Sequence, residues 1–183
     1  TNRKSRVVAI TDNVIPHEKR LGDALFTSYF IKACDGFVAM SQSVLKDLAK
    51  FETKKPALFN PHPMYNSFNA GISKSQACAN LNLDPNTHYL LFFGFIRAYK
   101  GLDLLLEAFS KLDRNKLNLK LLVAGEFYED ETPYMALVKK YAIEEDIIFY
   151  KDFIPDSEVH NYFSAADVTV QPYKNATQSG VTQ

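Results

Sequence analysis

Short apolar runs alternate with amphipathic segments along this chain, and the alternation constrains its fold more than any other feature. The clearest alternation lies in the second half. Its strand-like runs are residues 89–93, 119–124, 147–150 and 168–171, and its helical patterns are residues 74–81, 102–112, 134–142 and 157–165. Units of this length are joined by right-handed crossovers, which keep the strands parallel. The sequence therefore predicts an α/β fold with a doubly wound parallel sheet.

The first third of the chain shows the same alternation in a shorter form. Its strand-like runs are residues 7–10, 37–40 and 57–59, and its helical patterns are residues 23–33 and 42–51. Residues 60–71 then contain two prolines, three asparagines and one glycine, which break both periodicities and indicate a linker. We therefore expect residues 1–62 to be the last part of one domain and residues 63–183 to be a second domain, truncated at its C-terminus. An incomplete first sheet leaves strand edges uncovered, which allows a homo-oligomer of the fragment.

The composition excludes several classes of protein. Lys plus Arg and Asp plus Glu number 21 each, without a long run of like charge, so no nucleic-acid-binding surface is expected. No apolar run approaches the roughly 18 residues of a membrane span, and the first residues do not resemble a signal peptide. Cys34 and Cys78 are then expected to be buried free thiols in a reducing compartment, which places the protein in the cytoplasm.

One stretch carries the clearest chemical signal. Residues 89–93 form an unbroken apolar run, as in a parallel strand covered on both faces, and Gly94 ends it. The next helical pattern has a single apolar face, made of Leu102, Leu105, Leu106, Phe109 and Leu112. Arg97 and Lys100 lie just before this helix, whose free N–H groups and dipole attract an anion. The stretch therefore predicts a phosphate site.

Glycines follow three of the predicted strands, at positions 94, 125 and 180. Ligands of open parallel sheets bind beyond the carboxyl ends of the strands. Each glycine taken alone is also consistent with an ordinary turn. Together with Arg97 and Lys100, the three glycines indicate a diphosphate cradle.

Five motifs, in order along the chain, resemble those of the retaining GT-B glycosyltransferases of family 4. They are Phe93-Gly94 with Lys100-Gly-Leu-Asp-Leu-Leu-Leu-Glu-Ala108, Val123-Ala-Gly-Glu126, Ile147-Ile-Phe149 with Phe153-Ile-Pro-Asp156, Ala165-Ala-Asp-Val-Thr-Val-Gln-Pro-Tyr173, and Gln178-Ser-Gly180. Residues 55–183 resemble that family well and residues 6–62 resemble it more loosely. The resemblance implies two Rossmann-like domains, with residues 1–62 from the acceptor domain and residues 63–183 from the donor domain.

The resemblance also implies an activity. Members of the family transfer a sugar from a nucleotide-diphosphate sugar to a glycan or lipid-linked acceptor, with retention of configuration and without a bound metal or other cofactor. A hexosyltransferase-like enzyme of polysaccharide biosynthesis is therefore expected. For the full-length protein, the resemblance allows peripheral association with a membrane.

The donor-site residues follow from the matching positions. Those expected at the donor diphosphate are Gly94, Arg97, Lys100, Ser179 and Gly180, and those expected at the nucleotide are Gly125, Glu126, Phe153, Ile154 and Gln178. Lys100 matches the family's lysine directly, the alternative being a solvated lysine. Phe95 stands where the family has its arginine, so contact of Arg97 with phosphate and contact with solvent both stay open. Glu126 is equally consistent with a surface acid.

Three further polar residues have structural interpretations. Asp156 or Ser157 is expected to be the N-cap of the helix that follows it. Asp167, at the start of a predicted strand, is expected to support the fold.

Asp12 and His17 are the candidate catalytic residues. The family often places a histidine just after a strand of the first domain, facing the transferred sugar. Asp12 stands near that place here, and His17 follows five residues later. Either residue is also consistent with a loop or helix-capping role.

One departure from the family pattern bears on activity. Thr177 stands where the family usually has a glutamate for the donor ribose, so this fragment alone is expected to be inactive. A non-catalytic nucleotide-sugar-binding module or scaffold of the same fold is therefore the alternative. A dinucleotide oxidoreductase would need G-x-G-x-x-G after a strand, and the chain has none.

Overall fold

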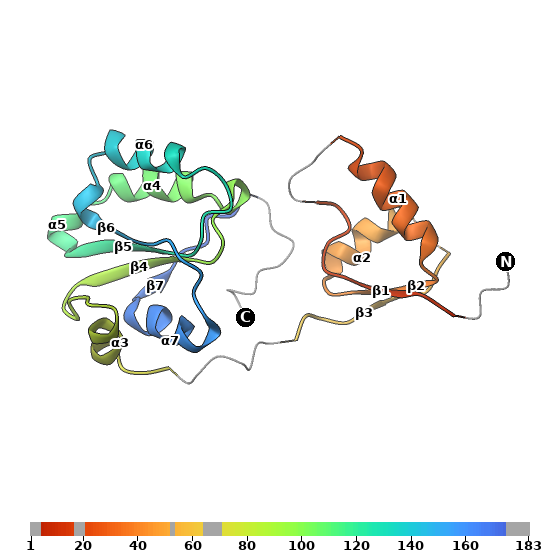
Figure 1. Ribbon diagram of the computed structural model, residues 1–183, viewed down its shortest axis with the longest axis horizontal. Coiled ribbons are helices and arrows are strands. Elements are labelled where there is room, and N and C mark those ends of the chain that lie inside the picture. Colours follow the sequence, from red (N-terminus) through yellow and green to blue (C-terminus); the bar gives the residue numbers. More distant parts are fainter. Residues whose placement is uncertain (1–4, 17–20, 52–53, 64–70, 175–183) are drawn as a thin grey trace. The chain divides into compact units, whose positions relative to one another are not determined.

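The computed structural model describes residues 5–16, 21–51, 54–63 and 71–174. These residues belong to two compact units, one made of the described residues up to 63 and the other of those from 71 onward. Each unit contains its own parallel sheet with helices packed on it (Figure 1). The α/β fold expected from the alternating pattern is confirmed.

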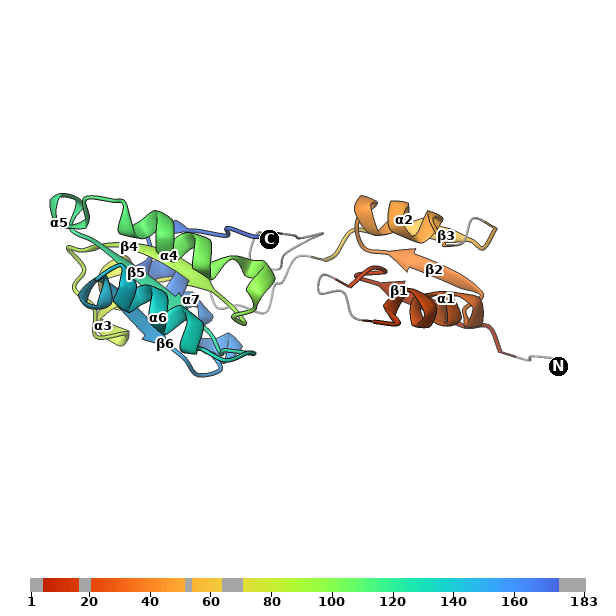
Figure 2. The ribbon, with the colours of Figure 1, turned by 90° about the horizontal axis from the view of Figure 1, so that it is seen from above.

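The first unit has three parallel strands in the order β1-β2-β3. They are β1 (Val8–Thr11), β2 (Gly36–Ala39) and β3 (Ala57–Phe59), connected through α1 (Asp23–Ala33) and α2 (Gln42–Ala49). Right-handed crossovers between strands in sequential order place both helices on one face of the sheet, as Figures 1 and 2 show. That face holds the core of the unit, and the opposite face exposes Val8, Ile10 and Leu58.

The second unit has four parallel strands in the order β6-β5-β4-β7. They are β4 (His88–Phe93), β5 (Leu119–Ala124), β6 (Ile147–Tyr150) and β7 (Val168–Thr169). The chain builds the sheet outward from β4 to β6 and then returns to place β7 on the other side of β4. The strand order therefore reverses beside β4, and a reversal of this kind opens a crevice for a ligand at the carboxyl ends of the strands.

Helices cover both faces of the second sheet (Figure 1). One face carries α4 (Leu102–Ser110) and α6 (Thr132–Lys140), and the other carries α3 (Lys74–Asn80) and α7 (Asp156–Ala165). The short α5 (Arg114–Leu117) and the 3₁₀ turns Ala98–Lys100 and Glu144–Asp146 lie in the connections. Leu91 packs in the core on the α3 and α7 side, and Phe92 packs in the core on the α4 and α6 side. Burial on both faces accounts for the unbroken apolar run of β4.

The helix after Gly101 is shorter than its apolar pattern predicts. It ends at Ser110, and Leu112, which was expected on its buried face, is 41% exposed. Asp113 gives the reason, because its carboxylate accepts a hydrogen bond from the backbone N–H of Lys116 (3.2 Å) and starts α5. An aspartate in this position stabilises a new helix start in place of another turn of the old helix.

The predicted N-cap of α7 is also wrong. Pro155 occupies the N-cap position, where its side chain makes no capping hydrogen bond, and Asp156 is the first residue of the helix. Proline fits the extended position before the helix because it has no N–H to leave unpaired there. The carboxylate of Asp156 is therefore available for another role.

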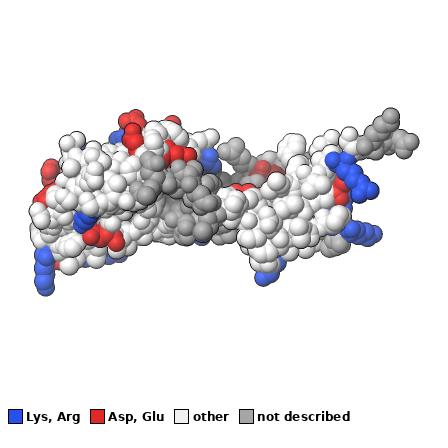
Figure 3. Space-filling model, turned by 90° about the horizontal axis from the view of Figure 1, so that it is seen from below, with Lys and Arg blue, Asp and Glu red and all other residues white. Residues whose placement is uncertain are grey.

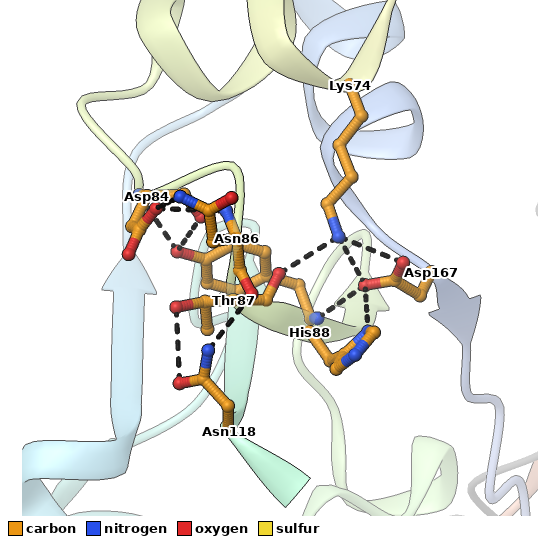
Figure 4. Close-up of polar contacts among 8 residues, drawn as sticks. Lys74, Asp84, Asn86, Thr87, His88, Asn118 and Asp167 are labelled. Atoms are coloured by element: carbon orange, nitrogen blue, oxygen red, sulfur yellow. Dashed lines mark hydrogen bonds and ion pairs between the residues drawn. The ribbon is translucent and has the colours of Figure 1, made fainter.

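Asp167 has the structural role expected of it, in a polar network at the amino ends of the strands (Figure 4). Its carboxylate accepts hydrogen bonds from Nζ of Lys74 (2.7 and 2.9 Å) and from the backbone N–H of Tyr89 (2.8 Å). Lys74 also donates to the carbonyl oxygen of Thr87 (2.9 Å). The network ties α3 to β4 and to the start of β7, away from the carboxyl edge of the sheet.

We expect Asp167→Asn to lower the free energy of unfolding by about 1–2 kcal/mol at neutral pH, the range for a half-exposed charged hydrogen-bonded group. Burial acts to raise the pKa of Asp167, but the hydrogen bonds from Lys74 and Tyr89 outweigh it and the pKa is lowered overall. A lowered carboxyl pKa stabilises the fold above the unfolded value of about 3.9 and stops doing so as the pH falls through the folded value. The difference between variant and wild type should therefore shrink below about pH 4.

Urea unfolding followed by circular dichroism at several pH values measures this difference. Asp152→Asn is the matched control, because Asp152 is an exposed aspartate of the same unit. An effect of Asp167→Asn that was equal at acid and neutral pH would contradict the assignment.

Candidate functional site

A cleft of about 190 Å³ lies at the carboxyl edge of the second sheet. Its walls come from the ends of β4 and β5, from the loop after β6 and from the start of α7. The lining residues are Phe93, Gly94, Phe95, Gly125, Glu126, Phe153, Ile154, Asp156 and Val159. The cleft therefore lies where open parallel sheets bind ligands.

Two glycines allow the ends of β4 and β5 to approach one another closely. Gly94 and Gly125 have φ angles of 96° and 141°, which side chains rarely adopt. A Cβ on Gly125 would contact the carbonyl oxygen of Gly94. A Cβ on Gly94 would lie 2.9 Å from Nζ of Lys100. The bare backbone at these two positions thus opens the floor of the cleft and brings the Lys100 ammonium to its edge.

The side chain of Lys100 is half-buried. Lys100 ends the 3₁₀ turn that precedes α4, and its Nζ lies 5.9 Å from the centre of the Tyr173 ring. Burial, together with the positive charge of Arg97, lowers the pKa of Lys100 to about 8. An anion bound beside Lys100 would restore the stability of its protonated form.

The described lysines and arginines of this chain are often paired with acids, and Figure 3 shows both signs in small groups on one face. Lys111 pairs with Glu107, and Lys151 pairs with Glu131, each at 2.7 Å. Among the described residues, by contrast, no carboxylate forms an ion pair with Lys100 or Arg97. Two neighbouring cations that form no ion pair with a described carboxylate are suited to a multiply charged anion.

Residues 172–174 fasten the turn that carries Lys100. The backbone N–H of Lys174 donates to the carbonyl oxygen of Tyr99 (2.8 Å), and Nζ of Lys174 pairs with Asp103 of α4 (2.7 Å). The rings of Tyr99 and Tyr173 meet edge to face, with centroids 6.1 Å apart. These contacts hold the chain after β7 beside the Lys100 turn.

The remaining lining of the cleft is largely apolar but includes two carboxylate side chains. Phe153 is 64% exposed, and with Ile154 it forms a wall that a flat ring could contact. Glu126 and Asp156 supply the carboxylates. A ligand with a flat ring, hydroxyl groups and an anionic part would match the cleft and its cationic edge.

The structure brings together most of the donor-site residues expected from the sequence. Gly94, Gly125, Glu126, Phe153 and Ile154 line one cleft, and Lys100 lies against Gly94. Phe95, Asp156 and Val159 also line it and were not predicted. Phe95 could have been predicted to line the cleft, because it directly follows the glycine that ends the strand.

The structure does not bring every predicted residue to the cleft. His17, Gln178, Ser179 and Gly180 lie outside the described residues, as does Thr177. Asp12 is exposed at the end of β1 in the first unit.

Within the described part of the chain, no group of three or more His, Cys, Asp and Glu side chains could hold a metal ion. None of the described helices is long and apolar enough to cross a membrane.

Comparison with known proteins agrees with this geometry. Residues 74–178 match the model of the family described as Glycosyl transferases group 1. The chain is 32% identical over 98 residues to the lipopolysaccharide 1,2-N-acetylglucosaminetransferase of Salmonella typhimurium, an alignment that covers 50% of this chain and 26% of that protein. The chain thus spans about a quarter of the length of that relative.

Solved structures show the same fold. The glycosyltransferase WaaG, involved in lipopolysaccharide biosynthesis, matches with a TM-score of 0.75 at 19% identity over 98% of this chain and 56% of its own. HepE of Anabaena, in complex with UDP and glucose, matches with a TM-score of 0.74 at 13% identity over 97% of this chain and 49% of its own. At these identities the likeness concerns the fold alone.

Proposed function

This chain belongs to the group 1 glycosyl transferases, and from that premise we propose that its second unit binds the donor of a sugar-transfer reaction. The donor is a nucleotide-diphosphate sugar, and the full-length protein transfers the sugar with retention of configuration to a glycan or lipid-linked acceptor. The observation that carries the proposal is the half-buried ammonium of Lys100, held beside Gly94 with no acid paired to it among the described residues.

The proposed chemistry is electrostatic. Breaking the bond between sugar and diphosphate leaves negative charge on the diphosphate, and fixed cations lower the energy of that step. Lys100 supplies one such cation and Arg97 a second. Ser179 and Gly180 belong to the same proposed diphosphate site. We propose no metal or organic cofactor for the reaction.

The nucleotide is assigned to the apolar end of the cleft. Phe153 and Ile154 form the wall for its base, while Gly125, Glu126 and Gln178 complete the nucleotide site. Asp156, which lines the same cleft, is the residue proposed to accept a hydrogen bond from a ribose hydroxyl. UDP is the first nucleotide to test, because the HepE structure of the same fold contains UDP.

The first unit is assigned to the acceptor domain of the enzyme. Asp12 at the end of β1, and His17 after it, remain the residues proposed to face the transferred sugar. A cytoplasmic location and peripheral association of the full-length protein with a membrane belong to the same proposal, since a lipid-linked acceptor lies at a membrane surface.

A non-catalytic nucleotide-sugar-binding module is the second candidate. Thr177 favours it, because this residue cannot supply the carboxylate that the family usually has there. Hydrolysis or transfer of the donor by the full-length protein distinguishes the two. Donor binding with no turnover would support the module and exclude the transferase.

Titration of UDP into the chain at several pH values tests the donor site directly. Lys100 has a pKa of about 8 before the ligand binds, so about nine-tenths of it is protonated at pH 7 and about one-tenth at pH 9. UDP affinity should therefore fall by about tenfold between these pH values.

Lys100→Arg is the informative control for this pH dependence. Arginine keeps its charge throughout the range, so UDP binding by this variant should be nearly independent of pH. Calorimetry on both proteins measures the effect. Absence of UDP binding, or a wild-type affinity that did not change with pH, would remove the lysine from the donor site.

A further inference from the structure

Arg97 stacks on the ring of Tyr128, close in sequence to Phe95 and Glu126, which line the cleft. The guanidinium carbon of Arg97 lies 3.9 Å from the centre of the Tyr128 ring. The ring of Phe95 meets the same tyrosine edge to face, at 5.9 Å and 78°. Tyr128 is 62% exposed, so this stack lies at the surface and contributes little to the packing of the core.

The backbone beyond the strand-ending glycines makes these residues neighbours. Ile96 and Phe127 form a parallel bridge, with hydrogen bonds from Ile96 N–H to the Glu126 carbonyl (2.9 Å) and from Tyr128 N–H to the Ile96 carbonyl (3.1 Å). Ile96 is buried and Phe127 packs against the core. Because side chains alternate along extended backbone, Phe95 and Arg97 point the other way.

That outward side is the side of the cleft. Phe95 and Glu126, one from each of the two paired loops, both line the cleft. Arg97 lies two residues after Phe95 and so is presented on the same side, about 6.6 Å further along. Its charge acts on Lys100 from there, since it contributes to the lowered pKa of that lysine.

We propose that Tyr128 is a positioning residue, whose ring holds the guanidinium of Arg97 at the cleft so that Arg97 and Lys100 act on one diphosphate. The proposal rests on the proposed donor function. The proposal also accounts for the position of Arg97, which differs from that of the family's arginine. Phe95 occupies the position directly after Gly94, and Arg97, two residues later, needs a contact that holds its guanidinium toward the cleft. A long side chain fixed before binding loses less conformational entropy when the ligand arrives.

The test is a set of UDP titrations on the chain, repeated with inorganic pyrophosphate. Tyr128→Phe keeps the ring and should bind both ligands like the wild type. Tyr128→Leu should weaken both by about two- to fivefold, the range for an exposed cation–π contact. In an Arg97→Met background, Tyr128→Leu should have no further effect, because the ring then has no guanidinium to hold.

Tyr29→Leu is the matched control, since Tyr29 is an exposed tyrosine of the first unit and none of the described residues of that unit lines the cleft. Three results would overturn the proposal: wild-type affinity in Tyr128→Leu, equal weakening by the Phe and Leu variants, or an undiminished effect of Tyr128→Leu without Arg97. If Lys100→Met weakens UDP binding while Tyr128→Leu does not, only this inference fails. If neither UDP nor pyrophosphate binds the wild type, the donor function fails with it.

Discussion

Replacement of Lys100 by methionine is expected to weaken UDP binding by about 1.5–3 kcal/mol, or roughly 10- to 150-fold. This is the range for removing one charged hydrogen-bonding partner from an anion. Methionine is similar in length and flexibility, so the loss should come from the charge and not from an altered shape. Arg97→Met should cost less, because Arg97 stacks on the exposed ring of Tyr128, whereas Lys100 lies beside Gly94, which lines the cleft.

The same substitution should stabilise the fold. The pKa of Lys100 is about 8 in the folded chain against an ordinary value of 10.5, so the unfolded chain holds this proton more tightly. Stability is therefore reduced by the charge below about pH 8 and rises between about pH 8 and pH 10.5. Removing the charge should raise the free energy of unfolding by about 1–2 kcal/mol at neutral pH, a figure reduced to allow for solvent screening of a half-buried group.

Opposite effects on binding and on stability would identify Lys100 as a residue kept for function. Circular dichroism during urea unfolding gives the stability, and calorimetry with UDP gives the affinity. Lys116→Met, at an exposed position on α5, should change neither. A Lys100→Met variant that was less stable than the wild type would contradict the assigned cost of the buried charge.

The order of the elements in the fold could be predicted because each signal is local. β4 contains the unbroken apolar run of residues 89–93, and α1 lies where its pattern predicts. The errors arise where two local signals compete. Asp113 stops α4 before Leu112 by starting another helix, and Pro155 takes the position before α7 that Asp156 was expected to hold.

The candidate site was predictable where a residue follows a strand directly. Gly94, Gly125 and Glu126 line the cleft because the carboxyl ends of parallel strands meet at one edge. The contact of Tyr128 with Arg97 could not be predicted from strand ends. It depends on the register between Ile96 and Phe127, which lies beyond the strands and joins segments about thirty residues apart.

Gly125→Ala is expected to lower the stability of the second unit by about 2–6 kcal/mol. The new methyl group would lie 2.7 Å from the carbonyl carbon and 3.2 Å from the Cα of Gly94, so one of the two backbones must move. Overpacking of this kind costs about 1–3 kcal/mol. The φ angle of 141° adds about 1–3 kcal/mol for any residue with a side chain.

The loss should extend to the donor site, because both glycines line the cleft and Gly94 lies against Lys100. The chain has no tryptophan, so circular dichroism during urea unfolding is the suitable measure of stability, with UDP calorimetry alongside it. Gly71→Ala is the matched control, since its methyl group would meet only Oγ of Ser164, at an ordinary 3.6 Å. That variant should stay within about 1 kcal/mol of the wild type. If Gly125→Ala were equally mild, the close approach of the β4 and β5 ends could not be what opens the floor of the cleft.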